Sequence, residues 1–245
     1  MILGNHFNIE SNGLLTFDPE VLAPTEPDVR RLSDAIPVLY ADNVNPSDQP
    51  LYYMYRGVCF KSDKELYEQN DIRYDITVIL PGTIGREFIK TVGHFHPLKP
   101  HSSETYPEYY EVIDGEAIYI LQKNNRNGDV EEIMAVEAKK GDKVFIPSSY
   151  GHVTINPGNQ PLVMANLIES HFSSLYEPFR DKHGAAYYYL ESDDGKGEYV
   201  KNNLYQNSVG LKLVAAPNLD QPVNLKSKSL YEAFIDDPEA FKILK

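Results

Sequence analysis

Short runs rich in Tyr, Val, Ile and Phe dominate the chain from Leu51 onward, separated by clusters of Gly, Pro, Asn and Asp. Such runs are typical of β-strands, and the intervening clusters are typical of turns. Closely spaced strands joined by turns favour a sandwich or barrel over βαβ units. The predicted strands are Leu51–Phe60, Tyr74–Leu80, Phe88–His96, Tyr109–Gln122, Val130–Glu137, Lys143–Ile146, His152–Asn156, Leu162–Glu169 and Ala186–Leu190.

The segment before these strands is rich in proline and has one short helical pattern. Within Asp28–Ile36 the apolar residues Val29, Leu32 and Ile36 have helical spacing, which predicts a helix. We interpret residues 1–50 as an N-terminal arm packed on a barrel.

The last part of the chain begins with a polar, charged stretch and ends in two predicted helical turns separated by Pro238. We expect this segment to cover the barrel or an oligomer partner. The pattern therefore divides the all-β chain into an arm (1–50), a barrel (51–190) and a C-terminal helical extension (191–245).

The charge of the chain narrows the choice of partners. Asp and Glu number 36 against 23 Lys and Arg, for a net charge of −13 over 245 residues. So acidic a surface should repel nucleic acid and anionic membranes. A phosphorylated substrate is also an anion, so it would need a local positive site.

Cysteine content and apolar runs narrow the cellular setting. The single cysteine, Cys59, excludes an intrachain disulfide and any multi-cysteine metal site. The first residues lack a basic region followed by an apolar run, and no run approaches the length of a membrane span. We expect a cytoplasmic protein that is neither secreted nor membrane-spanning.

A Gly93-His94-Phe95-His96 segment lies at the end of a predicted strand. Residues i and i+2 of a strand face the same side, so His94 and His96 should point together while Phe95 points away. Two neighbouring imidazoles form a potential pair of metal ligands.

Two further segments strengthen this prediction and resemble the two motifs of the cupin superfamily. The second motif, G-x5-P-x-G-x2-H-x3-N, is matched at Gly141, Pro147, His152 and Asn156, with Ser149 in place of a glycine. The first motif keeps both histidines and a Glu-x6-Gly that begins at Glu108, although eleven residues separate His96 from Glu108.

The cupin resemblance implies a fold and a metal site. The fold would be a double-stranded β-helix, also called a jelly-roll barrel. The implied ligands of one divalent metal ion per chain are His94, His96, Glu108 and His152. Three neutral nitrogens and one carboxylate suit a first-row metal and leave coordination positions open for substrate.

A closer resemblance is to the cupin-type phosphoglucose isomerases typical of archaea. It is carried by Arg30–Asp34, Leu80–Phe88, Thr91–His96, Glu108–Tyr110 and His152–Gly158. The resemblance implies a metal-dependent homodimer that interconverts glucose 6-phosphate and fructose 6-phosphate in glycolysis and gluconeogenesis. The implied metal is Fe²⁺, with Zn²⁺, Ni²⁺ or Mn²⁺ as alternatives.

The same resemblance implies roles for individual residues. Glu108 would be both a ligand and the candidate base, with Tyr110 beside it as a second catalytic residue. A metal-bound carboxylate is a weak base, so the sequence leaves proton transfer and hydride shift both open. The residues implied around the sugar phosphate are Tyr52, Thr77, Gly82, Thr91, Gly93 and Tyr176. Lys90 is out of phase with Thr91, and we expect it to be solvated.

The chain departs from the family pattern in the loop 97–107 and at Ser174. The loop 97–107 is longer than its family equivalent, which makes Glu104 a rival ligand and places Lys99 and His101 as sources of positive charge at the pocket mouth. Ser174 stands at the position where the family has a histidine. His171 could take the role of that histidine.

Two other functions remain open on the sequence. The same ligand set serves metal-dependent dioxygenases or another sugar-phosphate isomerase, and a cupin can also bind sugar without catalysis. Residues directed at a phosphate would separate the isomerase from the dioxygenase.

Overall fold

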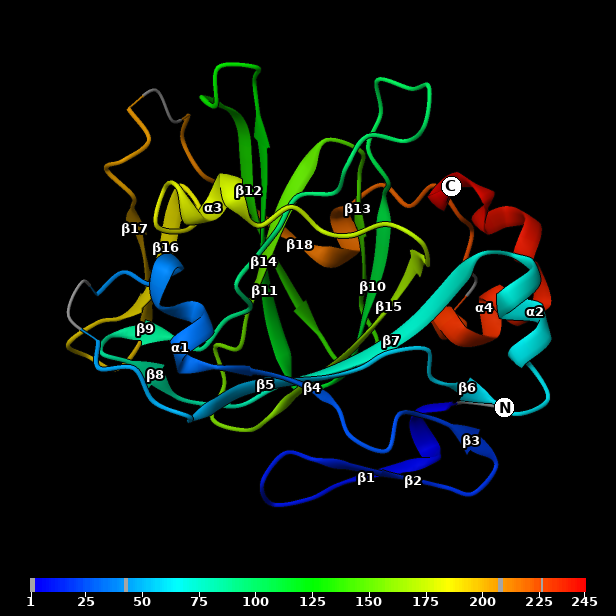
Figure 1. Ribbon diagram of the computed structural model, residues 1–245. Coiled ribbons are helices and arrows are strands. Elements are labelled where there is room, and N and C mark those ends of the chain that lie inside the picture. The colour runs from blue at the N-terminus through cyan, green and yellow to red at the C-terminus, as the bar shows by residue number, and fades with distance from the viewer. Residues whose placement is uncertain (1–2, 42–43, 207–208, 226) are drawn as a thin grey trace.

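Two β-sheets face each other at the centre of the molecule (Figure 1). The computed structural model describes residues 3–41, 44–206, 209–225 and 227–245. The larger sheet has the order β13-β10-β15-β7-β5-β4, with β4 Asp28–Arg31, β5 Pro50–Tyr55, β7 Ile72–Ile79, β10 Glu108–Asp114, β13 Lys143–Ile146 and β15 Leu162–Glu169. The smaller has the order β14-β11-β12-β18, with β11 Glu116–Asn124, β12 Val130–Lys139, β14 Tyr150–Ile155 and β18 Lys212–Ala215.

The predicted all-β jelly-roll class is confirmed. Within the described residues, the two facing sheets do not close into one continuous hydrogen-bonded barrel. Pairing is antiparallel throughout both sheets except between β12 and β18, which run parallel. The break Lys123–Asp129, in which the Asn127-Gly128 pair predicts a hairpin loop, contains the turn between β11 and β12.

Both faces of the six-stranded sheet are buried. Because side chains alternate along a strand, Tyr52 points into the core between the sheets while its neighbour Tyr53 packs on the outer face. All eight residues of β15 are buried for this reason. The inner core also takes Ile120 and Val136 from the smaller sheet.

Shorter elements surround the two sheets. A third sheet has the order β17-β16-β9-β8, and two pairs are formed by β1 with β2 and by β3 with β6. Their bounds are β1 Phe7–Ile9, β2 Leu15–Phe17, β3 Val21–Leu22, β6 Cys59–Phe60, β8 Thr83–Ile84, β9 Glu87–Phe88, β16 Tyr187–Glu191 and β17 Gly197–Lys201. The α-helices are α1 Leu32–Ala35, α2 Lys64–Gln69, α3 Glu177–Arg180 and α4 Leu230–Asp236, and the 3-10 turns are η1 Leu3–Asn5, η2 Ile36–Val38, η3 Ala216–Asn218 and η4 Pro238–Leu244.

Four of the predicted elements differ from the structure. Leu51–Phe60 comprises the two strands β5 and β6, Tyr109–Gln122 comprises β10 and β11, and two further predictions are partly wrong. The predicted helix Asp28–Ile36 begins as strand β4, because Arg30 pairs with Tyr52 of β5 at the edge of the large sheet. Helical structure starts only at Leu32. The predicted strand Phe88–His96 is also interrupted: β9 ends at Phe88, and His94 joins β14 only through an isolated bridge.

The C-terminal segment closes the outer face of the large sheet. The two predicted helical turns are present as α4 and η4, on either side of Asp237. Ser229 caps α4 in a capping box with Glu232, and Tyr231 and Phe234 of this helix pack against Tyr67 of α2. Figure 1 shows α2 and α4 together on one side of the molecule.

The remaining findings concern Cys59 and the membrane. Cys59 is buried in the outer core, as expected of a small apolar residue. Across the described residues, every helix is too short or too polar to cross a bilayer.

Candidate metal centre

Three separate segments bring the predicted ligands together between the two sheets. Glu108 is the first residue of β10, and His152 lies on β14 of the opposite sheet. His94 is joined to His152 by two backbone hydrogen bonds, His94 N to His152 O at 3.1 Å and His152 N to His94 O at 3.0 Å. His96 follows on the same side, as the strand geometry predicts, with its Nε2 atom 3.2 Å from that of His94.

The four side chains converge on one small volume. The Nε2 atoms of His96 and His152 lie 3.4 and 3.3 Å from Oε2 of Glu108. One potential ligand atom from each of the four residues lies within 4.8 Å of the other three. His96, Glu108 and His152 are almost fully buried, and His94 is partly exposed.

His94 and His152 are held in the neutral form that binds metals. Burial lowers the pKa of His94 and of His152 well below the ordinary value of 6.5, and the charge of neighbouring imidazoles lowers each further. Nδ1 of His96 lies 2.8 Å from the carbonyl oxygen of Tyr106. A carbonyl only accepts hydrogen bonds, so Nδ1 carries the proton and the Nε2 lone pair of His96 faces the cluster.

The cluster suits a divalent cation. Glu108 Oε2 is buried and makes no hydrogen bond within the described part of the chain, although three imidazoles surround it. A cation bound by this oxygen would offset the desolvation of the carboxylate. Nitrogen and carboxylate donors together select a first-row divalent metal. The four residues can therefore hold a divalent metal ion.

Two glycines permit the close approach of the histidine segment to β14. Gly93 has φ +76°, and a Cβ atom there would lie 2.5 Å from Cγ2 of Val153. A Cβ atom on Gly151 would lie 2.4 Å from the Phe95 ring. Only glycine fits these positions, so Gly93 and Gly151 fix the backbone on which His94 and His152 stand.

Tyr110 lies against the cluster. Its hydroxyl is 3.1 Å from Nε2 of His152, on the strand that also carries Glu108. Burial raises the pKa of Tyr110 well above 10, and the Glu108 charge raises it further, so the hydroxyl stays protonated at neutral pH. Tyr110 therefore lies beside Glu108 and His152, and the catalytic roles of Glu108 and Tyr110 stay predictions.

The predicted sugar-phosphate residues fall into two groups. Tyr52 accepts a hydrogen bond from the Val92 backbone N–H at 3.2 Å, and the ring of Tyr176 lies 5.6 Å from that of His94. These two tyrosines and Gly93 are thus close to the cluster. Thr91 accepts a hydrogen bond from Thr154 N through its Oγ1 atom.

The other two predicted substrate residues lie on or after β7. Thr77 is buried in the middle of β7, opposite Met54 and Met164. Gly82 has φ +116° and follows β7, and its carbonyl accepts a hydrogen bond from Ile89 N. The position of Thr77 and Gly82 near a substrate stays a prediction.

The long loop supplies support to a ligand. Tyr106, near its end, holds the His96 ring and stacks on Phe172 with ring centres 4.6 Å apart. Glu104 is exposed and lies outside the cluster. Lys99 donates to the Ile243 carbonyl in the C-terminal segment, which directs it away from the cluster.

The remaining polar candidates of this region are exposed or only partly buried. His101 is exposed on the loop with φ +58°. His171 is exposed and bonds to Glu169 at 2.7 Å. Ser174 is partly buried. None of these three belongs to the cluster.

Lys90 corrects a sequence prediction, because it is buried rather than solvated. Its Nζ atom lies 2.7 Å from Glu87 Oε1 and donates to the Val38 carbonyl at 2.6 Å. The second oxygen of Glu87 accepts from Tyr40 N. The prediction assumed that side chains alternate along a strand through Lys90, but β9 ends at Phe88. The third sheet and η2 cover the Lys90 side chain.

Arginines near Tyr176 were not selected as site residues from the sequence. Nη2 of Arg30 donates to the Tyr176 hydroxyl at 3.3 Å, and Cζ of Arg180 lies 5.3 Å from the centre of the Tyr176 ring. Arg30 belongs to a segment that carried the family resemblance, but its helical interpretation hid the pairing with Tyr52.

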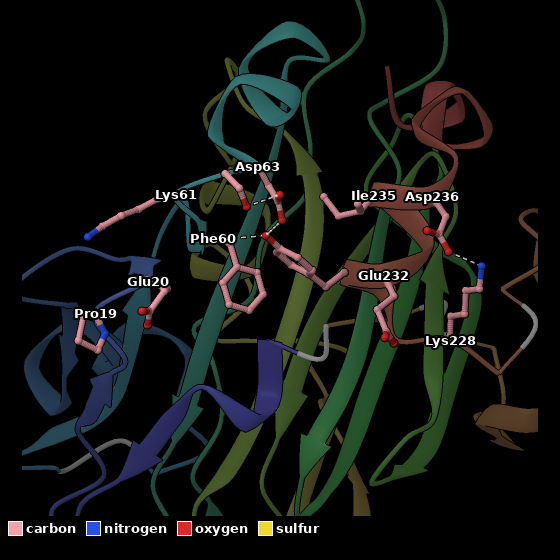
Figure 2. Close-up of a pocket in the computed structure, with 11 residues that line it drawn as sticks. Pro19, Glu20, Phe60, Lys61, Asp63, Lys228, Glu232, Ile235 and Asp236 are labelled. Atoms are coloured by element: carbon pink, nitrogen blue, oxygen red, sulfur yellow. Dashed lines mark hydrogen bonds and ion pairs between the residues drawn. The ribbon is translucent and has the colours of Figure 1, made fainter.

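A cavity elsewhere does not coincide with this chemistry. It measures about 570 Å³ and lies between the N-terminal segment, the start of α2 and helix α4. Figure 2 shows Phe60, Asp63 and Glu232 among the residues that line it. The Tyr231 hydroxyl accepts a hydrogen bond from Phe60 N at 2.9 Å and donates one to Asp63 Oδ2 at 2.7 Å. None of the four clustered residues lines the cavity. We favour the cluster as the functional site because its donor set has a defined chemistry.

Sequence comparisons relate this chain to one family. A sequence model of the family described as glucose-6-phosphate isomerase (GPI) matches residues 29–207. Glucose-6-phosphate isomerase of Thermococcus kodakarensis is 29% identical over 177 residues, which cover 71% of this chain and 85% of that protein. The enzyme of the same name from Pyrococcus horikoshii is 24% identical over 78% of this chain and 94% of that protein. Among solved structures, a variant of oxalate decarboxylase from Bacillus subtilis is similar over 51% of this chain and 27% of that chain, at 18% identity and a TM-score of 0.35.

Proposed function

The chain belongs to the glucose-6-phosphate isomerase family, and we propose that its four-residue cluster binds a divalent metal where glucose 6-phosphate and fructose 6-phosphate are interconverted. The protein is an aldose–ketose isomerase. The observation that carries the proposal is the convergence of three imidazoles and one buried carboxylate between the sheets, inside the matched region.

The chain's own residues supply binding, orientation and proton handling. His94, His96, Glu108 and His152 would hold the metal, which when bound polarises the carbonyl and hydroxyl oxygens of the reacting carbons. The neutral tautomer of His96, fixed by Tyr106, keeps its Nε2 lone pair directed inward.

Glu108 and Tyr110 are the groups that can handle protons at this centre. Glu108 is the one carboxylate of the cluster, so it is the candidate base if hydrogen moves between the two carbons as a proton. Tyr110 keeps its proton, because its pKa is raised, and its hydroxyl can donate a hydrogen bond to a substrate oxygen.

Sugar binding is assigned to the surrounding residues. Tyr176 lies beside His94, and Tyr52 lies beside Val92, which precedes Gly93. Hydroxyl and backbone N–H donors of Thr77, Gly82, Thr91 and Gly93 complete the proposed sugar-phosphate residues.

The identity of the metal, the assembly and the location are finer proposals. We infer Fe²⁺, because a site of three imidazoles and one carboxylate suits this ion, with Zn²⁺, Ni²⁺ and Mn²⁺ as competitors. A homodimer in the cytoplasm follows from the family resemblance and from a substrate that is a phosphorylated metabolite.

Turnover with and without chelator tests the proposal. The Fe²⁺-loaded chain should convert fructose 6-phosphate to glucose 6-phosphate, and chelator should abolish the activity until Fe²⁺ is returned. Absence of chelator-sensitive conversion would contradict it. Glu108→Gln should lose activity, whereas the exposed Glu104→Gln variant, from the same loop region, should keep it.

A further inference from the structure

Arg30 is a partly buried cation without a carboxylate partner, close to the proposed substrate site. Arg56, Arg73 and Arg86 each form an ion pair with a carboxylate. Within the described ranges, neither Arg30 nor Arg180 has an ion pair of that kind. An unpaired guanidinium kept partly out of water is costly unless a ligand supplies its counter-charge.

The surroundings of Arg30 do not neutralise it. Asp34 acts on Arg30 through its charge, but its Oδ2 atom accepts a hydrogen bond from the Arg31 backbone N–H. Burial raises the pKa of Tyr52 to about 12 and the Arg30 charge opposes this rise, so Tyr52 stays a neutral hydroxyl at physiological pH. The positive charge of Arg30 is therefore available to an anion.

The position of Arg30 matches the phosphate end of a substrate. Arg30 sits opposite Tyr52 in the β4–β5 pairing, and the Tyr52 hydroxyl contacts Val92 N, between Thr91 and Gly93. The guanidinium is thus next to the backbone segment already proposed to receive the phosphate.

The distance to the metal ligands is also suitable. Cζ of Arg30 lies 5.6 Å from the centre of the Tyr176 ring, and that ring lies 5.6 Å from the His94 ring. These two steps connect the guanidinium to the metal ligands over a span that an extended six-carbon sugar phosphate can bridge. Arg180 lies at the same tyrosine, with its Cζ 5.3 Å from the ring centre, and it is exposed.

We propose that Arg30, assisted by Arg180, binds the phosphate group of the sugar phosphate and so selects phosphorylated over free sugars. The proposal rests on the proposed function of the centre and adds residues to it. One Arg30 N–H is used by Tyr176, and a guanidinium has further donors in a planar fork that suits a phosphate. These arginines also provide the local positive charge that an anionic substrate needs in a chain of net charge −13.

Steady-state kinetics of three variants test the arginines. Arg30→Gln should raise the KM for fructose 6-phosphate at least about tenfold, the equivalent of one lost charged contact, and leave kcat within about twofold. Arg180→Gln should raise KM less, because its side chain is exposed. Arg126→Gln removes the same charge from the exposed β11–β12 turn and should change neither constant.

Binding of inorganic phosphate, measured by calorimetry on the full chain, gives a readout independent of turnover. Wild type should bind phosphate more tightly than Arg30→Gln, and Arg30→Lys should recover part of the affinity with an unchanged melting temperature. Equal phosphate affinity in wild type and Arg30→Gln, or a loss confined to kcat, would overturn the proposal. If wild type turns over no sugar phosphate, the proposed function fails while the phosphate titration still decides the role of Arg30.

Discussion

His152 is the proposed ligand that links both sheets to the cluster, because it lies on β14 and contacts Glu108 and Tyr110 of β10. His152→Ala should weaken metal binding by more than about 100-fold, since loss of outer-shell partners alone commonly costs 10–100-fold. Ser174→Ala, outside the cluster, should bind metal as wild type does. Elemental analysis after dialysis measures both, and full occupancy in the His152 variant would refute its assignment as a ligand.

Tyr109 illustrates a buried residue whose titration affects stability rather than chemistry. Burial raises its pKa from 10.0 to about 12 against the opposing hydrogen bond from Val223 N. Between these values the unfolded chain loses the proton before the folded chain does. Stability is therefore retained below pH 10 and falls as the pH rises toward 12, by about 1.4 kcal/mol per pH unit for this group.

Urea unfolding between pH 9 and 11.5 measures this dependence. Tyr109→Phe should show a shallower loss of stability above pH 10 than wild type does. Tyr40→Phe, which removes a hydroxyl from an exposed ring, provides the comparison. A wild-type slope in Tyr109→Phe would exclude this source of the alkaline sensitivity.

The positions of single site residues could be predicted where neighbouring residues or a motif determine them. The proximity of His94 and His96 follows from alternation along a strand, and the cupin resemblance placed Glu108 and His152 beside them. Arg180 was missed because the sequence patterning did not reveal helix α3, in which Arg180 lies one turn after the N-cap residue Tyr176. Lys90 was misplaced because its partner Glu87 lies three residues away on a strand that ends at Phe88.

At the scale of elements, the connection from β9 to the histidines depends on Gly93. Gly93→Ala should destabilise the fold by more than the about 1–2 kcal/mol expected for a left-handed non-glycine residue, because its Cβ would also meet Val153. Gly128→Ala is a matched control, with φ +84° and no atom within 4 Å of the added Cβ. The free energy of unfolding in urea and the metal content should both be lower for Gly93→Ala than for Gly128→Ala. Equal losses in the two variants would contradict a role for close packing at Gly93.

Helices and strands were predicted correctly where the strand pairing in the structure agrees with the local sequence pattern. The turn between β11 and β12 was placed by Asn127-Gly128, a strong hairpin signal. The helix predicted over Asp28–Ile36 was half wrong, because hydrogen bonding of Arg30 to the edge of the large sheet outweighed the helical spacing of its apolar residues.

At the scale of the whole molecule, the C-terminal segment completes the outer core, which lies on the outer face of the large sheet. Phe234 of α4 is fully buried among the aromatic side chains on the outer face of the large sheet. Phe234→Ala should cost about 3–5 kcal/mol of unfolding free energy, while Ile243→Ala, at a side chain 40% exposed, should cost little. Chemical denaturation measures both. Activity per folded molecule should be unchanged, and a selective loss of turnover in Phe234→Ala would give the segment a catalytic role.

The division into arm, barrel and extension was drawn from sequence patterning alone and stays a prediction. Strand β18, within residues 191–245, adds an edge to the smaller sheet by pairing with β12. Its parallel partner is far away in sequence, and such long-range pairing leaves no local signal.

The overall charge does not oppose a sugar-phosphate substrate. The excess of acidic residues describes the chain as a whole, whereas Arg30 and Arg180 both lie at Tyr176, whose ring is 5.6 Å from the ring of His94 in the cluster. The proposed metal and these arginines would concentrate positive potential at the proposed site, and a contribution from Lys99 or His101 stays a prediction.

A titration of metal-depleted protein with Fe²⁺ tests the central claim most directly, with bound iron and fructose 6-phosphate isomerisation measured on the same samples. Activity should rise in proportion to bound iron and reach its plateau at one ion per chain, as a single four-ligand cluster requires. Full turnover by the metal-free chain would contradict the claim. So would a His152→Ala variant that reaches the same activity plateau as wild type, because turnover would then not depend on a metal in this cluster.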